Sequence, residues 1–385
     1  MVFSGFTRFF MKIYSYIHID KKSPLPIYQQ LIRAFESFSR DSSAGTAIPS
    51  ERELSEQLAI SRTILRKALK ECVENGMLVK SWGKGIFVAE KPRKRVLVIG
   101  TASHDYTHPG IYVMPGVEKR AQELEVTLER IPTNFLYNKE ESFVTALLER
   151  EKFSGILITD YCCGFEEGAL TALRKTAIPI YWPHMGLESA LTSPFHCGYI
   201  DSRKAFCSAL TSLRDAGCRR IATLTVPRKH SEFLRGYTQE EFQRLQESLG
   251  LEWDPALIFS SSHDPGEIAS VLNSFFKKGH TPFDGLLCFS DFFAIHAMDH
   301  LKRKGIRIPE DVAVMGYCGY PGGEFMDPPL STVDYHYFRI GYEALDKLFF
   351  LAETRPADVQ KFEGCFTNTM RGTLPAAMKG KMVCA

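Results

Sequence analysis

Short apolar runs alternate with amphipathic helical segments from residue 96 onward, and no other feature of the sequence restricts the fold as strongly. The apolar runs lie at 96–100, 126–131, 155–159, 178–181, 221–226, 286–289 and 312–316. Between them lie helical patterns, among them 202–216, 232–249, 265–278 and 292–304. Strand and helix in this order indicate an α/β fold with a parallel, doubly wound sheet. Because about 290 residues are too many for one such sheet, we expect two similar lobes.

The first 90 residues follow a different pattern, so the 385-residue chain should form at least two compact units. Apolar spacing in this part is helical and ends in a short hairpin. The charged, proline-containing stretch 91–95 that follows is typical of a joint between domains. We predict a head over 17–89, a linker over 90–95 and a body over 96–378.

Positive charge is concentrated at the end of the head. Residues 50–95 hold eleven Lys/Arg and six Asp/Glu, a balance of +5, which leaves 36 basic and 39 acidic residues, or −3, in the rest of the chain. A basic head on a mildly acidic body indicates that the head meets a polyanion and the body does not.

Nothing in the composition indicates secretion or a membrane. The ten cysteines are scattered without a C-x-x-C pair, which is typical of reduced thiols in a cytosolic protein. No run of 18 apolar residues exists, and the apolar stretch 1–10 holds Arg8 and lacks a signal-peptide cleavage site. We therefore expect a cytoplasmic protein with no membrane segment. A start at Met1 and a start at Met11 both fit the sequence.

Residues 48–72 predict two helices separated by a short break. Ser50 and Glu53 form a capping box at the start of the first helix, and the second begins at Arg62. One arc of the second helix is polar or cationic and consists of Arg62, Thr63, Arg66, Lys67 and Lys70. The opposite side is apolar and consists of Ile64, Leu65, Ala68, Leu69 and Cys72. The second helix is thus expected to be buried on one face and cationic on the other.

Such a helix suits the major groove of DNA, which is wide enough to admit it. Ser61 and Thr63 can donate to a phosphate or base, and the two arginines can make bidentate contacts with guanine or phosphate. Strands at 77–81 and 86–88 follow, joined by a Trp-Gly-Lys-Gly turn whose glycines let the backbone approach a phosphate. The alternative is a solvated basic helix in a helical bundle. The order of capping box, break, cationic helix and hairpin favours DNA binding.

These motifs resemble the GntR-type winged helix-turn-helix. The likeness covers about residues 17–89 and rests on Pro26-Ile27-Tyr28-Gln29-Gln30-Leu31, Pro49-Ser50-Glu51-Arg52-Glu53-Leu54, Ser61-Arg62-Thr63 and Gly83-Lys84-Gly85. It implies DNA contacts at Arg52, Ser61, Arg62, Thr63, Arg66 and Gly83. To these we add Lys67 and Lys84 because of their charge. The stretch 38–47 departs from the family, which has an apolar, glycine-containing turn there.

The body carries no motif of a catalytic or cofactor site. It lacks a P-loop, a G-x-S-x-G nucleophile elbow and a G-x-G-x-x-G after its first strand, so we predict neither an enzyme nor a cofactor. His104 and His108 follow the first strand, and His296 and His300 are four apart on a helix. Both pairs are more typical of polar or half-buried histidines than of ligands, so no metal is predicted.

The body resembles the LacI/GalR-type sensor domain, a periplasmic-binding-protein-like fold with two lobes and a hinge. The likeness covers nearly all of 95–375. It rests on Arg235-Gly236-Tyr237 at the opening of a helix, Ser290–Asp291 at the end of a strand, the stretch 305–316, Pro328-Pro329-Leu330-Ser331-Thr332-Val333, and a strand ending at Arg371-Gly372-Thr373. A GntR-type head on such a body resembles the arabinose-repressor architecture.

The resemblance implies an effector contact at Arg235, whose guanidinium can hold vicinal hydroxyls or a carboxylate. Ser290 with Asp291 replaces the family's Asn-Asp pair, and Cys318 replaces a carboxylate of its Gly-[Phe/Tyr]-Asp-Asp stretch. These changes argue against a free sugar held in the family's usual way. The aromatic rings of Tyr106, Tyr161 and Trp182 can stack on a sugar, although they can equally be packing residues. The predicted effector contacts are Arg235, Ser290, Asp291, Cys318, Tyr106 and Tyr161.

The predicted function is a sequence-specific transcription regulator. We expect a repressor of carbohydrate-related genes whose affinity for operator DNA changes when a sugar or sugar derivative binds between the lobes. A homodimer would place two heads on a pseudo-palindromic site. Two alternatives remain. One is a DNA-binding head fused to an α/β enzyme of the aminotransferase type, and the other is a sequence-blind architectural DNA binder, which should be basic throughout.

Overall fold

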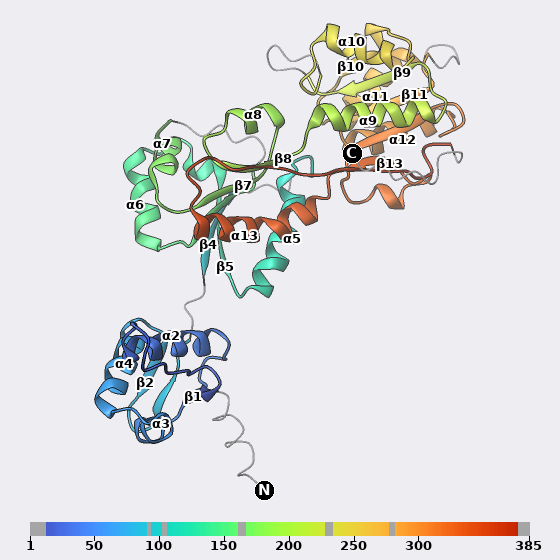
Figure 1. The fold of residues 1–385 in the computed structure, drawn as a ribbon. Helices are drawn as coiled ribbons and strands as arrows, with labels where there is room; N and C mark the ends of the chain where they lie inside the picture. The colour runs from blue at the N-terminus through green and yellow to red at the C-terminus, as the bar shows by residue number, and fades with distance from the viewer. Residues whose placement is uncertain are drawn as a thin grey trace. The chain divides into compact units, whose positions relative to one another are not determined.

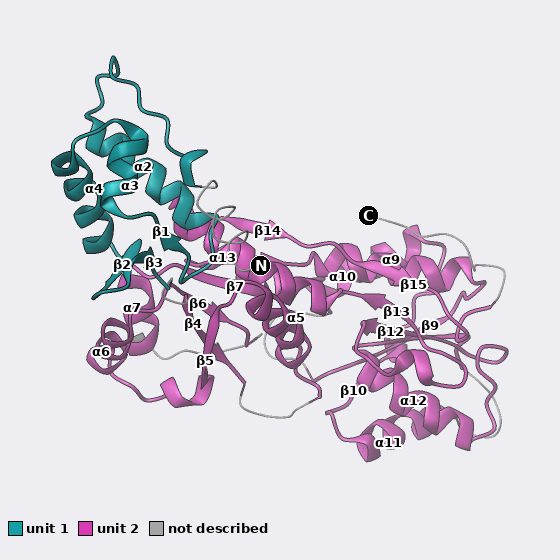
Figure 2. Ribbon diagram, turned by 90° about the horizontal axis from the view of Figure 1, so that it is seen from below, with its two compact units in different colours: residues 1–93 teal, residues 94–385 magenta. Residues whose placement is uncertain are grey.

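The computed structural model describes residues 13–90, 94–101, 106–160, 167–227, 234–276 and 282–375. The chain divides into two compact units, Met1–Arg93 and Lys94–Ala385, which Figure 2 shows in teal and magenta. Within these described ranges, no helix has the length and apolar character needed to cross a membrane.

The first unit packs helices α2, α3 and α4 against a small antiparallel sheet. Its elements are α2 (Ile27–Arg40), β1 (Ala47–Ile48), α3 (Glu51–Leu58), α4 (Arg62–Glu74), β2 (Leu78–Ser81) and β3 (Gly85–Val88), with strand order β1-β3-β2. The apolar faces of the helices meet in one core that includes Leu31, Phe35, Leu54, Leu65 and Leu78. This is a winged helix-turn-helix, in which β2 and β3 form the wing.

The second unit contains two lobes, each built on a sheet of six described strands. The sheet of the first lobe has the order β14-β8-β7-β6-β4-β5 and is parallel throughout. Its strands are β4 (Arg95–Gly100), β5 (Thr127–Pro132), β6 (Gly155–Ile158), β7 (Ile180–Met185), β8 (His196–Tyr199) and β14 (Lys361–Glu363). Its helices are α5 (Gly110–Glu123), α6 (Glu141–Glu151), α7 (Glu167–Lys175), α8 (Leu187–Thr192) and α13 (Tyr337–Thr354), with a 3-10 turn at η1 (Thr133–Leu136).

The sheet of the second lobe has the order β10-β9-β11-β12-β13-β15, and only its edge pair β13–β15 is antiparallel among the described pairings. Its strands are β9 (Ile221–Thr225), β10 (Ile258–Ser260), β11 (Gly285–Cys288), β12 (Ala313–Cys318), β13 (Ser331–Asp334) and β15 (Thr367–Thr369). Its helices are α9 (Ser202–Asp215), α10 (Gln239–Ser248), α11 (Pro265–Phe275) and α12 (Asp291–Arg303), with 3-10 turns at η2 (Pro255–Leu257) and η3 (Gly323–Phe325).

The described chain passes between the two lobes three times, after β8, after β13 and after β14 (Figure 1). One apolar cluster includes buried residues of both lobes, while each lobe has a further cluster on its other sheet face. The doubly wound parallel sheets predicted from the sequence are confirmed, and the seven apolar runs correspond to β4, β5, β6, β7, β9, β11 and β12. The lobes are therefore joined by a hinge of three crossing segments.

Helices α5 and α13 lie side by side in the first lobe (Figure 1) and approach through glycines. A Cβ atom placed on Gly341 would lie 1.9 Å from the carbonyl oxygen of Val113, and one placed on Gly116 would lie 2.0 Å from that of Phe338. Arg120 of α5 also pairs with Asp346 of α13 at 2.8 Å. Because the two backbones touch directly, any side chain at either glycine would force the helices apart.

Some local expectations are wrong. Arg235 does not open a helix, because it has a φ of 48° in a turn that bridges Leu234 and Tyr237, and α10 begins only at Gln239. Thr238 and Glu241 form the capping box that sets this later start. Asp291 begins α12 rather than ending a strand, since β11 stops at Cys288. The last described strand ends at Thr369, so 371–373 lies outside it.

Candidate nucleic-acid interface and effector site

Side-chain caps position α4 at the surface of the head. The Ser50 hydroxyl accepts a hydrogen bond from the Glu53 N–H at 3.2 Å, and the Glu53 carboxylate accepts from the Ser50 N–H at 2.8 Å. Helix α3 then ends at Ala59, whose φ of 50° turns the chain. Ser61 caps α4 by accepting from the Ile64 N–H at 3.3 Å. Since that hydroxyl oxygen accepts within the helix, its proton remains available for a phosphate.

The predicted two-faced character of α4 is present in the structure. Its buried residues are Leu65, Ala68, Leu69 and Cys72. Its exposed residues include Arg62, Thr63, Arg66, Lys67 and Lys70. A helix fastened by one apolar face presents the opposite face to solvent, and here that face is cationic.

Several cations on the surface of the head contact acidic or aromatic side chains of the same unit. Arg66 pairs with Glu51 at 2.6 Å, and Arg52 pairs with Glu56 at 3.2 Å. Lys67 places its ammonium 3.8 Å from the centre of the Tyr28 ring. The arginine side chains of these pairs are 66% and 75% exposed, so each pair contributes about 1 kcal/mol or less and a DNA phosphate can compete for the arginine.

The wing is a tight turn between β2 and β3. Gly83 and Gly85 have φ values of 70° and 115°, which only glycine adopts without strain, and the Lys84 N–H donates to the Ser81 carbonyl at 3.1 Å. Lys84 is exposed, and a Cβ on either glycine would meet no atom within 4 Å. The backbone at the tip is therefore open to an approaching molecule.

In the body, the predicted effector residues Arg235, Asp291 and Cys318 lie close together. The Arg235 guanidinium lies 3.9 Å from the Phe289 ring centre and 4.3 Å from that of Tyr317, and it donates to the Phe289 carbonyl. Burial raises the pKa of the Cys318 thiol to about 11, and the charges of Arg235 and Asp291 both act on it. Cys318 has a φ of 91°, a conformation that costs a non-glycine residue energy.

Asp291 is completely buried and already hydrogen-bonded. It accepts from the Thr332 hydroxyl at 2.6 Å and from the Tyr320 N–H at 2.5 Å. Burial raises its pKa from 3.8 to about 7, against the lowering effect of these two hydrogen bonds. The neighbouring Ser290 is also buried. Both side chains therefore lie inside the protein in this structure and are not exposed to solvent.

The aromatic candidates differ in their surroundings. Tyr106 is 68% exposed, and its carbonyl accepts from the Tyr112 hydroxyl at 2.7 Å. Tyr161 lies outside the described residues, as does His104. Trp182 is buried and donates to the Asp160 carbonyl at 2.7 Å, which makes it a packing residue.

Sequence reasoning missed an aromatic cluster that joins the lobes around Arg235. Tyr320 of the second lobe stacks on Tyr112 of the first, with ring centres 4.4 Å apart, and its hydroxyl donates to the Thr107 carbonyl at 3.3 Å. Tyr335 donates to the Tyr317 hydroxyl at 2.8 Å. The sequence does place tyrosines just after the segments that form β12 and β13. Because parallel strands gather their carboxyl ends at one edge of the sheet, these tyrosines could have been expected to lie close together.

His184 of β7 completes this aromatic cluster. Its ring centre lies 5.2 Å from that of Tyr337 and 5.8 Å from that of Tyr335. Burial, and then the charge of Arg235, lowers its pKa to about 3. The imidazole is therefore neutral, and the cationic group among these residues is the arginine.

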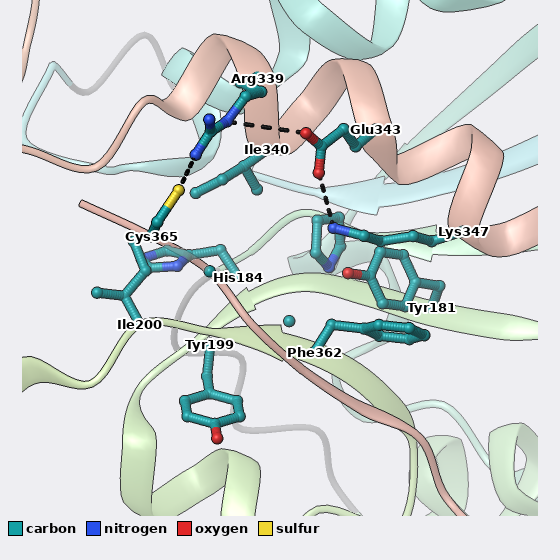
Figure 3. Close-up of a pocket in the computed structure, with 13 residues that line it drawn as sticks. Tyr181, His184, Tyr199, Ile200, Arg339, Ile340, Glu343, Lys347, Phe362 and Cys365 are labelled. Carbon is teal, nitrogen blue, oxygen red and sulfur yellow. Dashed lines mark hydrogen bonds and ion pairs between the residues drawn. The ribbon is translucent and has the colours of Figure 1, made fainter. Parts of the chain in front are cut away.

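A separate small pocket lies between α13 and the strands β7, β8 and β14 (Figure 3). Glu343 pairs with Lys347 at 2.9 Å and with Arg339 at 3.7 Å, and Arg339 also contacts the Cys365 sulfur. None of the predicted effector residues that the structure describes lines it. Its charged side chains satisfy one another.

Two of the histidines weighed as metal ligands, His108 and His296, contact an acidic and an aromatic side chain of the protein. Across the ranges that the structure describes, no three His, Cys, Asp or Glu side chains gather as a metal site requires. His296 packs against Phe292 with ring centres 4.5 Å apart, and burial lowers its pKa. His108 contacts Asp160 at 2.9 Å.

Known families match both parts of the chain. Residues 27–88 match the bacterial regulatory proteins of the gntR family, and residues 210–372 match the periplasmic binding protein-like domain. The chain therefore combines a gntR-family head over 27–88 with a periplasmic binding protein-like domain over 210–372. It is a transcription regulator, and the alternative of an enzyme fused to a DNA-binding head finds no support in its relatives.

Individual relatives agree with this architecture. An arabinose metabolism transcriptional repressor of Geobacillus stearothermophilus is 25% identical over 353 residues, covering 88% of the regulator and 94% of that protein. The sucrose operon repressor of Escherichia coli is 35% identical over 180 residues, covering 45% of the regulator and 54% of its own length. A LacI-family regulator from Enterococcus faecium, solved with bound ribose, has a TM-score of 0.59 at 16% identity, covering 73% of the regulator and 98% of that chain.

Proposed function

We propose that this regulator is a repressor that binds an operator through its head and is released when a small molecule binds between the lobes of its body. The observation that carries the proposal is the exposed cationic face of α4, whose opposite face is buried in the head. Its N-terminal residues would contact bases, and the remaining cations would contact phosphates. The proposed DNA contacts are Arg52, Ser61, Arg62, Thr63, Arg66, Lys67, Gly83 and Lys84. The proposed segments are a head over 17–89, a linker over 90–95 and a body over 96–378.

The proposed effector is a sugar derivative that contacts Arg235. Relatives named for arabinose and sucrose and a structural neighbour holding ribose support a carbohydrate. Asp291 accepts two protein hydrogen bonds and Cys318 lacks a carboxylate, which leaves the guanidinium as the strongest polar group for hydroxyls or an acidic substituent. We also propose that the bound effector is surrounded by Ser290, Asp291, Cys318, Tyr106 and Tyr161.

We place the regulator in the cytoplasm as a homodimer. Two identical heads would bind half-sites about one helical turn of DNA apart, or a multiple of that spacing. The effector would change operator affinity through its different affinities for two arrangements of the heads. Light scattering should therefore give twice the mass of one chain, and a monomer bound to a palindromic duplex would contradict this.

Arg66→Ala should weaken binding to a duplex selected from a random library by the full-length protein. A contact from the reading helix contributes roughly 1–3 kcal/mol, so the dissociation constant should rise by about 5- to 150-fold in a fluorescence-anisotropy titration. The fold should persist because the lost Arg66–Glu51 pair is exposed.

Arg244→Ala is the matched control for this experiment. Arg244 is an exposed arginine of the body that pairs with Glu240 at 3.7 Å, and its loss should leave DNA affinity unchanged. Equal affinities of the Arg66→Ala variant and the wild type would show that α4 does not read DNA.

A thermal-shift screen of pentoses, hexoses, sugar acids and sugar phosphates should identify the effector class. A ligand at 100 times its dissociation constant stabilises the folded protein by about 2.7 kcal/mol, which is roughly 5–10 °C for a domain of this size. Arg235→Ala should abolish the shift while Arg244→Ala keeps it. A full shift in the Arg235→Ala variant would place the effector elsewhere.

A further inference from the structure

The tip of the wing exposes a tryptophan that the proposed DNA contacts do not use. Trp82 is 97% exposed, whereas Trp182 is 5% exposed and Trp253 packs half-buried against the core of the body. All three tryptophans of the chain lie in the described ranges. A fully exposed indole gains nothing from the core of its own domain, so its contribution must come from another molecule or be absent.

The backbone around Trp82 makes the tip thin. Gly83 and Gly85 follow it with positive φ, and the space where their side chains would lie holds no atom within 4 Å. The hydrogen bond from the Lys84 N–H to the Ser81 carbonyl closes the turn at 3.1 Å. A tip of this kind suits a channel such as the minor groove of B-DNA, which is about 6 Å wide.

The charges near the indole favour a nucleic acid over an apolar partner. Lys80 and Lys84 on either side of Trp82 are both exposed. Apolar side chains that enter the minor groove partly unstack a base step, and flanking cations hold the phosphates beside it. The same hairpin follows directly after α4, which ends at Glu74.

We propose that Trp82 inserts into the minor groove beside the site read by α4, unstacks one base step and bends the duplex. This inference rests on the proposed function, because it assumes an operator. Pyrimidine–purine steps unstack most easily, so the indole selects such a step at a position that no hydrogen bond reads. Trp82 thereby becomes a specificity-determining residue of the regulator.

The test uses full-length protein and a duplex selected by it from a random library, labelled at both ends for energy transfer. Wild-type protein should shorten the end-to-end distance of the duplex. The duplex should also quench the tryptophan emission that comes from Trp82, which is the emission that the Trp82→Phe variant lacks. Trp82→Ala should raise the dissociation constant by roughly 5- to 150-fold, since stacking on a base is worth about 1–3 kcal/mol. It should also leave the duplex straight.

Two control variants separate the indole from its surroundings. Phe325→Ala removes an aromatic side chain of the body that is 86% exposed, and it should change neither affinity nor bend. Lys84→Ala should reduce the salt dependence of the binding constant by the amount expected for about one lost phosphate contact, while the bend persists.

Other outcomes would overturn the proposal. A duplex that stays straight with wild-type protein, or a Trp82→Ala variant with unchanged affinity and bend, would refute the insertion while the proposed function stands on the loss caused by Arg66→Ala. If wild-type protein selects no duplex from the library, the operator itself is absent and both proposals fail.

Discussion

Gly341→Ala should destabilise the body by about 3 kcal/mol or more. The new Cβ would lie 1.9 Å from the Val113 carbonyl oxygen and 2.9 Å from its carbon, far inside contact distance. Overpacking costs about 1–3 kcal/mol when side chains can yield, and here only the backbones of α5 and α13 can move. Their separation would also strain the 2.8 Å pair between Arg120 and Asp346. The melting temperature should fall by roughly 6–12 °C in calorimetry.

Gly266→Ala controls for the replacement of a helical glycine. Its Cβ would meet only the exposed Asp264 carboxylate oxygen, at 3.0 Å, and a shift of a few tenths of an ångström in that side chain relieves the contact while it still caps α11 by accepting from the Glu267 N–H. Better helix propensity should offset this contact, so the melting temperature should hardly change. Gly116→Ala, the reciprocal change on α5, should reproduce the loss. Unchanged stability of both α5 and α13 variants would mean that the helices do not touch through their backbones.

Asp291→Asn should remove a pH dependence of stability that runs opposite to the usual one for a carboxyl group. The pKa of Asp291 is about 7 in the folded protein, against an ordinary value of 3.8. Between these values the folded state holds a proton that the unfolded state has released, so the free energy of unfolding falls as pH rises. The loss begins near pH 4, is complete above about pH 7 and totals about 4 kcal/mol.

Asparagine suits this position because it stays neutral. Its carbonyl can accept from the Tyr320 N–H, and its amide can donate to the Thr332 hydroxyl oxygen, whose own proton can go to the Val333 carbonyl. The variant should therefore be more stable than wild type at pH 8, and the advantage should vanish near pH 4.

Urea unfolding at pH 4 to 8 measures the difference between the two proteins. Asp311→Asn is the control, because hydrogen bonds from Arg307 lower the pKa of Asp311 to about 2. That carboxyl is ionised throughout the range in the folded protein. Its stability contribution is lost as pH falls from about 5 toward 2, where the unfolded chain binds a proton first, so the slope above about pH 5 should not change. A constant difference between wild type and Asp291→Asn would show that Asp291 is ionised when folded.

The head was largely predictable because its elements depend on interactions between near neighbours. The capping box of Ser50 and Glu53 and the cap at Ser61 each join residues three apart, and the spacing of Leu65, Ala68 and Leu69 fixes the buried face of α4. The positive φ of Gly83 and Gly85 follows from a tight turn between two short strands. Each of these interactions can be identified within one stretch of sequence.

The strands of the body were predictable from the apolar runs, but the residues at which individual helices begin were not. The sequence placed Arg235 in a helix, because the apolar spacing around it is helical. A left-handed turn at Arg235 and Gly236 and a capping box at Thr238 move the start of α10 to Gln239. Capping and turn geometry decide at which of two possible residues a helix begins. The spacing of apolar residues carries no information about either.

The chain thus carries in its linear pattern the two-faced reading helix, the wing and the alternating strands, since those depend on periodicity and on bonds between neighbours. The surroundings of Arg235 arise only when the lobes meet. Tyr320 reaches the carbonyl of Thr107 in the other lobe across a sequence separation of 213. Within the first lobe, Arg120 likewise reaches Asp346 across a separation of 226. Contacts between residues this far apart depend on how packed layers are placed in space. Burial in those layers, rather than residue type, raises the pKa of Asp291 and lowers that of His184.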